Sequence, residues 1–196
     1  MTNPRNFYDR VLDDVCNRLL NEIPAHYKYH SLRHTLDVIE MTIKIGHGEK
    51  LTEAEIDLLK VAALFHDTGY LVERKNHELH SCEVFEEYAR KHKFDHQYYD
   101  FVKNCIMATC IPQSPQTIHE RILCDADLDY LGREDFSEIA EGLFQELIAC
   151  GDIQDRDQWN ELQIKFLGNI IYHTDYSKQY RGPQLAINLS QIKTTT

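Results

Sequence analysis

The segment ALFHDTGY, residues 63–70, places a histidine and an aspartate directly behind the apolar run LLKVAALF, residues 58–65. Four residues recur at spacings that share one face of a helix: Ile56, Leu59, Ala63 and His66. His66 therefore continues a stripe that faces a protein core. Because a buried imidazole or carboxylate costs free energy unless a partner satisfies it, His66 and Asp67 predict that other parts of the chain supply partners.

Helical periodicity runs through nearly the whole chain of 196 residues. The segments with apolar residues at a helical period are 5–22, 31–46, 52–67, 77–92, 95–110, 117–131, 134–150 and 156–173. Alternating strand patterns and Asn-Gly or Asp-Gly hairpin turns are absent from the sequence. We therefore predict an all-α helical bundle that forms a single domain over residues 1–196. The tail from Thr174 is weakly periodic, and we expect mostly irregular structure there.

The net charge of −11 at pH 7 argues against a broad surface for binding a nucleic acid polymer. No apolar run approaches the roughly 20 residues that cross a bilayer, and the N-terminus lacks the layout of a signal peptide. We expect a cytoplasmic protein that does not bind a membrane. A small anionic substrate remains compatible with this charge, but it requires a local source of positive charge, which a metal ion would supply.

Six cysteines are spread over the chain: Cys16, Cys82, Cys105, Cys110, Cys124 and Cys150. None belongs to a CxxC pair, which argues against a structural zinc knuckle. In a cytosolic protein of this size we expect buried free thiols and no thiol catalyst.

Two further helices carry metal-competent side chains on their apolar stripes. His34 lies in line with Val38, Met41 and Ile45. Asp127 has a leucine four residues away on either side, so it also faces inward. Three helices thus direct such groups to one core, which is how metal sites in helix bundles are built. A mixed nitrogen and oxygen set suits Mn, Fe, Ni, Zn or Mg.

These residues resemble the HD-domain superfamily of metal-dependent phosphohydrolases, whose pattern is H…HD…D on consecutive helices. The matching segments are YHSLRHTLDV with His34, ALFHDTGY with His66 and Asp67, and CDADLDYLG with Asp127. The HExxS element that begins at residue 77, the segment MATCIPQSP and the segment DADLDYLGREDF are similar to a small stand-alone subgroup. The resemblance covers about residues 27–175. It implies an all-α fold and a divalent metal held by His34, His66, Asp67 and Asp127, and it implies neither the number of ions nor a particular substrate.

Within this resemblance, Asp67 would both bind metal and orient the nucleophile. His77 and Glu78 follow the HD pair closely, and we expect one of them to donate a proton or orient water; an exposed helix start is the alternative. The run HELH, residues 77–80, is one residue short of the zincin signature, so no protease is expected.

The sequence leaves open whether five more residues near the motifs contact the substrate or are exposed to solvent: His30, His80, Arg33, Arg74 and Lys75. Glycine-rich phosphate loops and a nucleophile elbow are absent from the sequence.

The expected function is metal-dependent hydrolysis of a phosphoester or phosphoanhydride in a small phosphorylated molecule, which we expect to be a nucleotide. Two alternatives remain. One is a di-iron oxygenase of the HD type, in which His77 and His80 would help to hold a second ion. The other is a regulatory module that binds a metal or a ligand without turnover. The sequence leaves the oligomeric state open.

Overall fold

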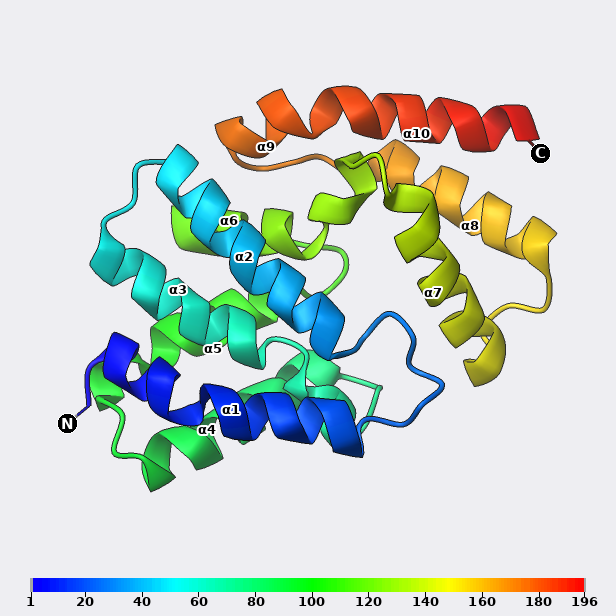
Figure 1. Ribbon diagram of the computed structural model, residues 1–196. Helices are drawn as coiled ribbons and strands as arrows, with labels where there is room; N and C mark the ends of the chain where they lie inside the picture. The colour runs from blue at the N-terminus through cyan, green and yellow to red at the C-terminus, as the bar shows by residue number, and fades with distance from the viewer. Residues whose placement is uncertain (1, 196) are drawn as a thin grey trace.

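The computed structural model describes residues 2–195 and is built from helices (Figure 1). Its α-helices are α1 (Pro4–Glu22), α2 (Leu32–Gly48), α3 (Glu53–Phe65), α4 (His77–Lys91), α5 (Tyr99–Ala108), α6 (Ile118–Asp127), α7 (Phe136–Cys150), α8 (Arg156–Asn169), α9 (Asp175–Tyr180) and α10 (Gly182–Thr195). Three short 3-10 helices are η1 (Thr68–Leu71), η2 (His96–Tyr98) and η3 (Asp129–Gly132). Residues 2–195 contain no β-strand, only an isolated bridge between Thr2 and Phe94. The all-α prediction is confirmed.

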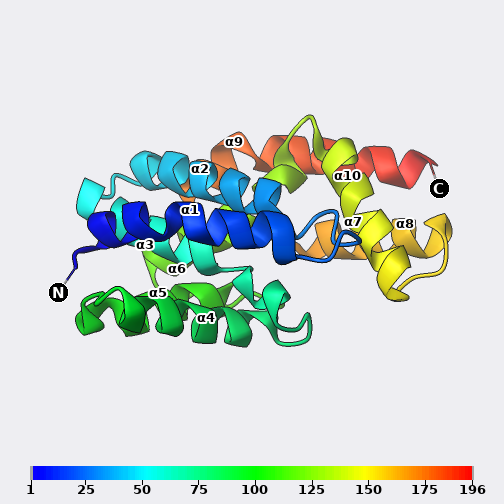
Figure 2. The same cartoon turned by 60° about the horizontal axis from the view of Figure 1, so that its bottom comes forward.

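The helices form two groups, each around its own hydrophobic core. The larger core lies among α1 to α6, and the smaller one among η3, α7, α8 and α10, which lie together on the right of Figure 1. Figure 2 shows α4 and α5 on one side of α1 and α3, with α2 on the other side. Because a single residue, Leu128, separates the end of α6 from the start of η3, η3 links the two groups. The prediction of a single domain stays a prediction.

The central helix of the larger core is α3, which packs against α1, α2, α4, α5 and α6. Its start is fixed by a capping box, in which the Thr52 side chain accepts from the Glu55 backbone N–H and the Glu55 side chain accepts from the Thr52 N–H. Eight of its residues are buried: Ile56, Leu58, Leu59, Val61, Ala62, Ala63, Leu64 and Phe65. The apolar segment is thus explained by contacts on nearly every side of the helix.

A close approach of two backbones fixes the turn after α3. A Cβ atom on Gly69 would overlap the carbonyl oxygen of His77, so only glycine fits where η1 meets the start of α4. The Gly69 N–H also donates to the buried hydroxyl of Ser81 at 2.8 Å. These contacts hold the first turn of α4 against the end of α3, where His66 and Asp67 lie.

The prediction of an irregular tail from Thr174 is wrong, because the tail forms α9 and α10. Thr174 caps α9 by accepting a hydrogen bond from the Ser177 N–H at 3.1 Å. Leu185, Leu189 and Ile192 of α10 then pack on the smaller core at helical spacing. Only three apolar residues carry this stripe, which is why the periodicity is weak.

The segment predicted as one helix over 117–131 is divided. α6 ends at Asp127, Leu128 leaves the α-helical conformation with φ −102° and ψ 13°, and η3 begins at Asp129. Asp127 therefore lies in the last turn of a helix and not in its middle.

All six cysteines are free thiols, as expected. Cys82, Cys105 and Cys124 are buried, but the expectation of burial is wrong for Cys110, which is exposed in the segment after α5. Cys16 and Cys150 are partly buried. No helix among residues 2–195 combines the length and hydrophobicity needed to cross a membrane.

Candidate metal centre

His66 and Asp67 lie where α3 ends inside the larger core. Their exposed fractions are 0% and 4%. The His66 Nδ1–H donates to the Ala63 carbonyl at 2.8 Å, in the preceding turn of the helix. This hydrogen bond fixes the ring and, in the neutral imidazole, leaves the lone pair on Nε2, the arrangement typical of metal-binding histidines.

His34 from α2 and Asp127 from α6 approach the same point. The His34 Nε2 atom lies 3.3 Å from His66 Nε2 and 3.1 Å from Asp127 Oδ1, and His66 Nε2 lies 3.6 Å from that same oxygen. One potential ligand atom from each of these three residues lies within 4.8 Å of the others. Three helices far apart in the sequence therefore bring two imidazoles and a carboxylate together, and this group could hold a metal ion.

Asp67 adds a second carboxylate to this group. Its Oδ2 atom lies 3.4 Å from His34 Nε2 and 3.3 Å from His66 Nε2. The same oxygen is buried and has no hydrogen-bond partner among the described residues. A buried carboxylate oxygen without a hydrogen bond is costly, and coordination to a cation would satisfy it. The four residues thus fit a divalent metal ion.

The four side chains strongly perturb one another. Burial alone lowers the pKa of His34, but its hydrogen bond to Asp127 and the nearby carboxylate of Asp67 outweigh burial and raise the pKa to about 9. The pKa of His66 is also raised, because the same carboxylates outweigh its burial. Burial raises the pKa of each aspartate, yet the imidazoles prevail and lower it, to about 2 for Asp127. The imidazoles and carboxylates thus favour one another's charged forms, and a divalent cation would take the place of the imidazole protons beside the two carboxylates.

His77 and Glu78, both predicted to act in catalysis, lie at the start of α4. The His77 Nε2 atom is 3.4 Å from Asp67 Oδ1 and 3.5 Å from Glu78 Oε1. Burial lowers the pKa of His77, but Asp67 and Glu78 outweigh burial and raise it. The structure therefore places His77 against the second oxygen of Asp67, with Glu78 beyond it.

The sequence reasoning missed Glu146, a fully buried glutamate of α7. Its Oε2 accepts hydrogen bonds from the Tyr29 and His30 backbone N–H groups, each at 3.1 Å, and its Oε1 lies 2.5 Å from His30 Nδ1. The helical spacing of the sequence could have identified Glu146 as buried. It lies three residues after Leu143 and ten after Phe136, on the inward stripe of its helix.

Glu146 thereby orients His30 toward the candidate metal centre. The His30 ring stacks on the Tyr70 ring at 4.2 Å between centroids, and its centroid lies 6.1 Å from that of His34 and 6.0 Å from that of His77. Since Nδ1 is held by Glu146, the other ring nitrogen of His30 remains for a substrate or a water molecule.

The remaining residues that the sequence left open lie outside this group. His80 pairs with Glu83 at 2.9 Å and lies 3.9 Å from Glu73. Arg33 is largely exposed and 3.5 Å from Glu138, Arg74 pairs with Asp152, and Lys75 is exposed.

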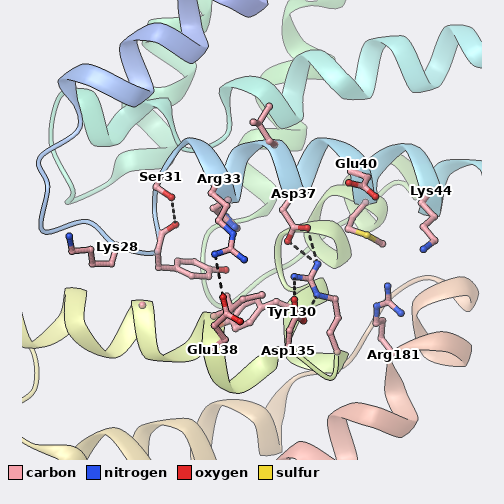
Figure 3. A pocket seen from close by; sticks show the side chains of 17 residues that line it. Lys28, Ser31, Arg33, Asp37, Glu40, Lys44, Tyr130, Asp135, Glu138 and Arg181 are labelled. Carbon is pink, nitrogen blue, oxygen red and sulfur yellow. Dashed lines mark hydrogen bonds and ion pairs between the residues drawn. The ribbon is translucent and has the colours of Figure 1, made fainter.

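A cleft of about 600 Å³ adjoins the candidate metal centre at His34. It lies between α2 and α7, and Tyr130 is among the residues that line it (Figure 3). Tyr29, which also lines it, packs against the His34 ring at 4.5 Å between centroids. Its volume is in the range of pockets that bind small molecules. We call it the α2 cleft.

Comparison with known protein families gave a match over half of the chain. A family model described as the HD domain matches residues 30–129, which begin at His30 and end two residues after Asp127. No curated protein and no solved structure matches the chain.

Proposed function

The chain belongs to the HD domain family, commonly metal-dependent hydrolases, and from this premise we propose that it is a phosphohydrolase that acts on a small phosphorylated molecule. A nucleotide is the substrate class we expect. The observation that carries the proposal is the buried oxygen of Asp67, which has no hydrogen-bond partner among the described residues and lies within 3.4 Å of two imidazole nitrogens. An unpartnered carboxylate oxygen beside two imidazole nitrogens fits a site for a cation better than it fits a purely structural core.

His34, His66, Asp67 and Asp127 would hold the ion. A divalent cation at this position would lower the pKa of a water molecule and polarise a phosphoryl oxygen. It would also give an acidic chain the local positive charge that an anionic substrate requires.

The proton transfers fall to residues around this group. His77, whose Nε2 lies between Asp67 and Glu78, would hold the attacking water in position, and Glu78 would accept its proton. His30, which Glu146 holds through Nδ1, is placed to donate a proton to the leaving oxygen from Nε2. The Tyr70 ring contacts both histidines, whose ring centroids lie 6.0 Å apart.

The di-iron alternative needs a second histidine beside His77. His80 pairs with Glu83 instead, on the outer part of α4, so the geometry favours hydrolysis. A regulatory module without turnover has the same ligand set and is distinguished only by assaying turnover.

The test has two steps. Elemental analysis of the purified protein should find about one equivalent of a transition metal, and His66→Ala should lose most of it. His80→Ala is the matched control, because it removes a histidine outside the group and should keep the metal. Phosphate release is then measured over a panel of nucleotides with the metal that was found. A folded wild-type protein with neither bound metal nor metal-stimulated phosphate release contradicts the proposal.

A further inference from the structure

The α2 cleft collects positive charge in a strongly acidic chain. Five basic side chains line it: Lys28, Arg33, Lys44, Arg133 and Arg181. Figure 3 shows Lys28 and Arg33 at one end of the cleft and Lys44 and Arg181 at the other. Acidic residues line the cleft as well, so only those cations that they leave unpaired can bind a ligand.

Arg133 is fully engaged within the protein. Its Nη1 donates to both carboxylate oxygens of Asp37, at 2.8 and 2.9 Å, and its Nε and Nη2 donate to Asp135 at 3.0 and 3.2 Å. These three side chains form an ion cluster in the middle of the cleft. Two carboxylates therefore neutralise Arg133 and engage every nitrogen of its guanidinium.

Arg181 is held differently. Its Nε donates at 2.7 Å to Asp129, whose side chain is fully buried. The close approach of Gly132, where a Cβ would lie 2.5 Å from the Arg181 carbonyl oxygen, fixes the backbone as well. Among the described residues, the terminal amino groups of Arg181 have one long contact of 3.5 Å, to the Tyr180 carbonyl. A buried carboxylate thus holds one edge of the guanidinium, and the other edge lines the cleft.

Lys44 lies on the opposite wall, in the penultimate turn of α2. Among the described residues it forms no ion pair. A fixed guanidinium and an unpaired ammonium at one end of a cleft repel each other unless an anion lies between them. We propose that Lys44 and Arg181 bind a second anionic group of the substrate, remote from the phosphoryl group that is hydrolysed.

The geometry of α2 limits the substrate class. Lys44 lies ten positions after His34, which is roughly 15 Å along a helix axis. Between the two ends lies the cluster of Arg133 with Asp37 and Asp135, in which the carboxylates already engage the only cation. The uncharged Met41 and Ile139 also line the cleft. The substrate class is therefore a molecule with anionic groups at both ends and a largely uncharged middle. This inference rests on the proposed function, because it takes His34 as the end where hydrolysis occurs.

The test uses two probes that differ only in the distant anion: octane-1,8-diol bisphosphate and octyl phosphate. Isothermal titration calorimetry on the full chain with its bound metal should show the bisphosphate binding roughly tenfold more tightly, the ratio given by one charge-assisted contact. Lys44→Gln should reduce this ratio to roughly twofold and leave the affinity for octyl phosphate unchanged. Lys44 is exposed, so this variant is expected to fold.

Two further variants sharpen the result. Lys165→Gln removes an exposed lysine of α8, outside the cleft, and should keep the full ratio. Arg181→Gln combined with Asp129→Asn removes the guanidinium without leaving a buried charge unpaired, and should reduce the ratio as Lys44→Gln does. Equal affinities of the wild-type protein for the two probes would overturn the inference. So would a ratio of affinities that Lys44→Gln leaves unchanged, or one that Lys165→Gln reduces as much as Lys44→Gln does. Phosphate release from nucleotides tests the proposed function separately, because a protein that releases no phosphate can still bind the bisphosphate more tightly than octyl phosphate.

Discussion

Three aspartates alternate in the segment DADLD, residues 125–129, and each has a different partner. Asp125 accepts from the His173 and Thr174 N–H groups and from the Thr174 hydroxyl, at 2.8, 2.8 and 2.6 Å. Asp127 faces His34 and His66. Asp129 holds Arg181 in the α2 cleft. One short segment thus links the start of α9, the candidate metal centre and the cleft.

The first prediction separates Asp127 from Asp125. Asp127→Ala should abolish metal binding and turnover, because it removes a proposed ligand. Asp125→Ala should keep the metal and lower the free energy of unfolding by about 3 kcal/mol, since three donors lose a buried carboxylate. Metal stoichiometry and urea denaturation measure the two effects, with circular dichroism to show that both variants fold. Loss of the metal in Asp125→Ala and its retention in Asp127→Ala would reverse the assignment.

The sequence located the residues that meet in the candidate centre because each continues an apolar stripe. His34, His66 and Asp127 could be found in this way, since a stripe is a local property of one helix. The pairing of Arg181 with Asp129 spans 52 residues and that of His30 with Glu146 spans 116. No local pattern encodes such pairs, because they depend on how distant helices pack.

The second prediction concerns Glu146 and pH. Burial raises its pKa, but the contact with His30 outweighs burial and lowers the pKa below the ordinary value of 4.5. The resulting stabilisation is therefore complete above about pH 4.5 and is lost as the pH falls through the lowered pKa of the folded state. Glu146→Gln should lower the free energy of unfolding by about 1–3 kcal/mol at pH 7.

Urea denaturation of the wild type and of Glu146→Gln at pH 7 and near pH 4 checks this predicted pH dependence of stability. The difference between wild type and Glu146→Gln should shrink at the lower pH, where the wild-type carboxylate begins to protonate. A difference that grows as the pH falls would show that Glu146 does not stabilise the fold as a carboxylate.

At the scale of elements, α10 covers η3, the turn that follows α6. The Asn188 side chain amide donates to the Leu131 and Arg133 carbonyls at 2.8 and 2.9 Å. η3 has few backbone partners of its own because it is a single short turn. The tail helix therefore completes the hydrogen bonding of η3, a role that its weak apolar periodicity did not indicate.

The third prediction concerns this contact of Asn188. Asn188→Ala should lower the free energy of unfolding by about 1–3 kcal/mol, because two carbonyls in a buried position lose their donor. Urea denaturation measures the loss. Ser190→Ala, at an exposed position of the same helix, is the control and should change stability much less. Equal losses in the two variants would show that the contact with η3 is not responsible.

At the scale of the whole molecule, the candidate metal centre lies where separate helices of the larger core converge. His34 comes from α2, His66 and Asp67 follow α3, and Asp127 ends α6. α3 also packs against α2 and α6 directly. Hydrophobic packing and the four polar side chains therefore hold the same three helices, and a bound ion would add to a core that is already assembled.

The last prediction is that metal removal lowers stability without unfolding the protein. An ion that binds the folded state at a thousandfold excess over its dissociation constant stabilises it by about 4 kcal/mol, which is roughly 10 °C in Tm for a chain of this size. Thermal unfolding should therefore shift by about that amount when a chelator is added to the wild-type protein. The protein should stay folded at 25 °C, because the three helices also pack through the hydrophobic core and the imidazoles lie beside the two carboxylates in the absence of the ion. His66→Ala should show no shift with the chelator, and His80→Ala should show the full shift. A wild-type Tm that the chelator leaves unchanged, in protein shown to carry the metal beforehand, would mean that the ion is bound elsewhere than between these helices.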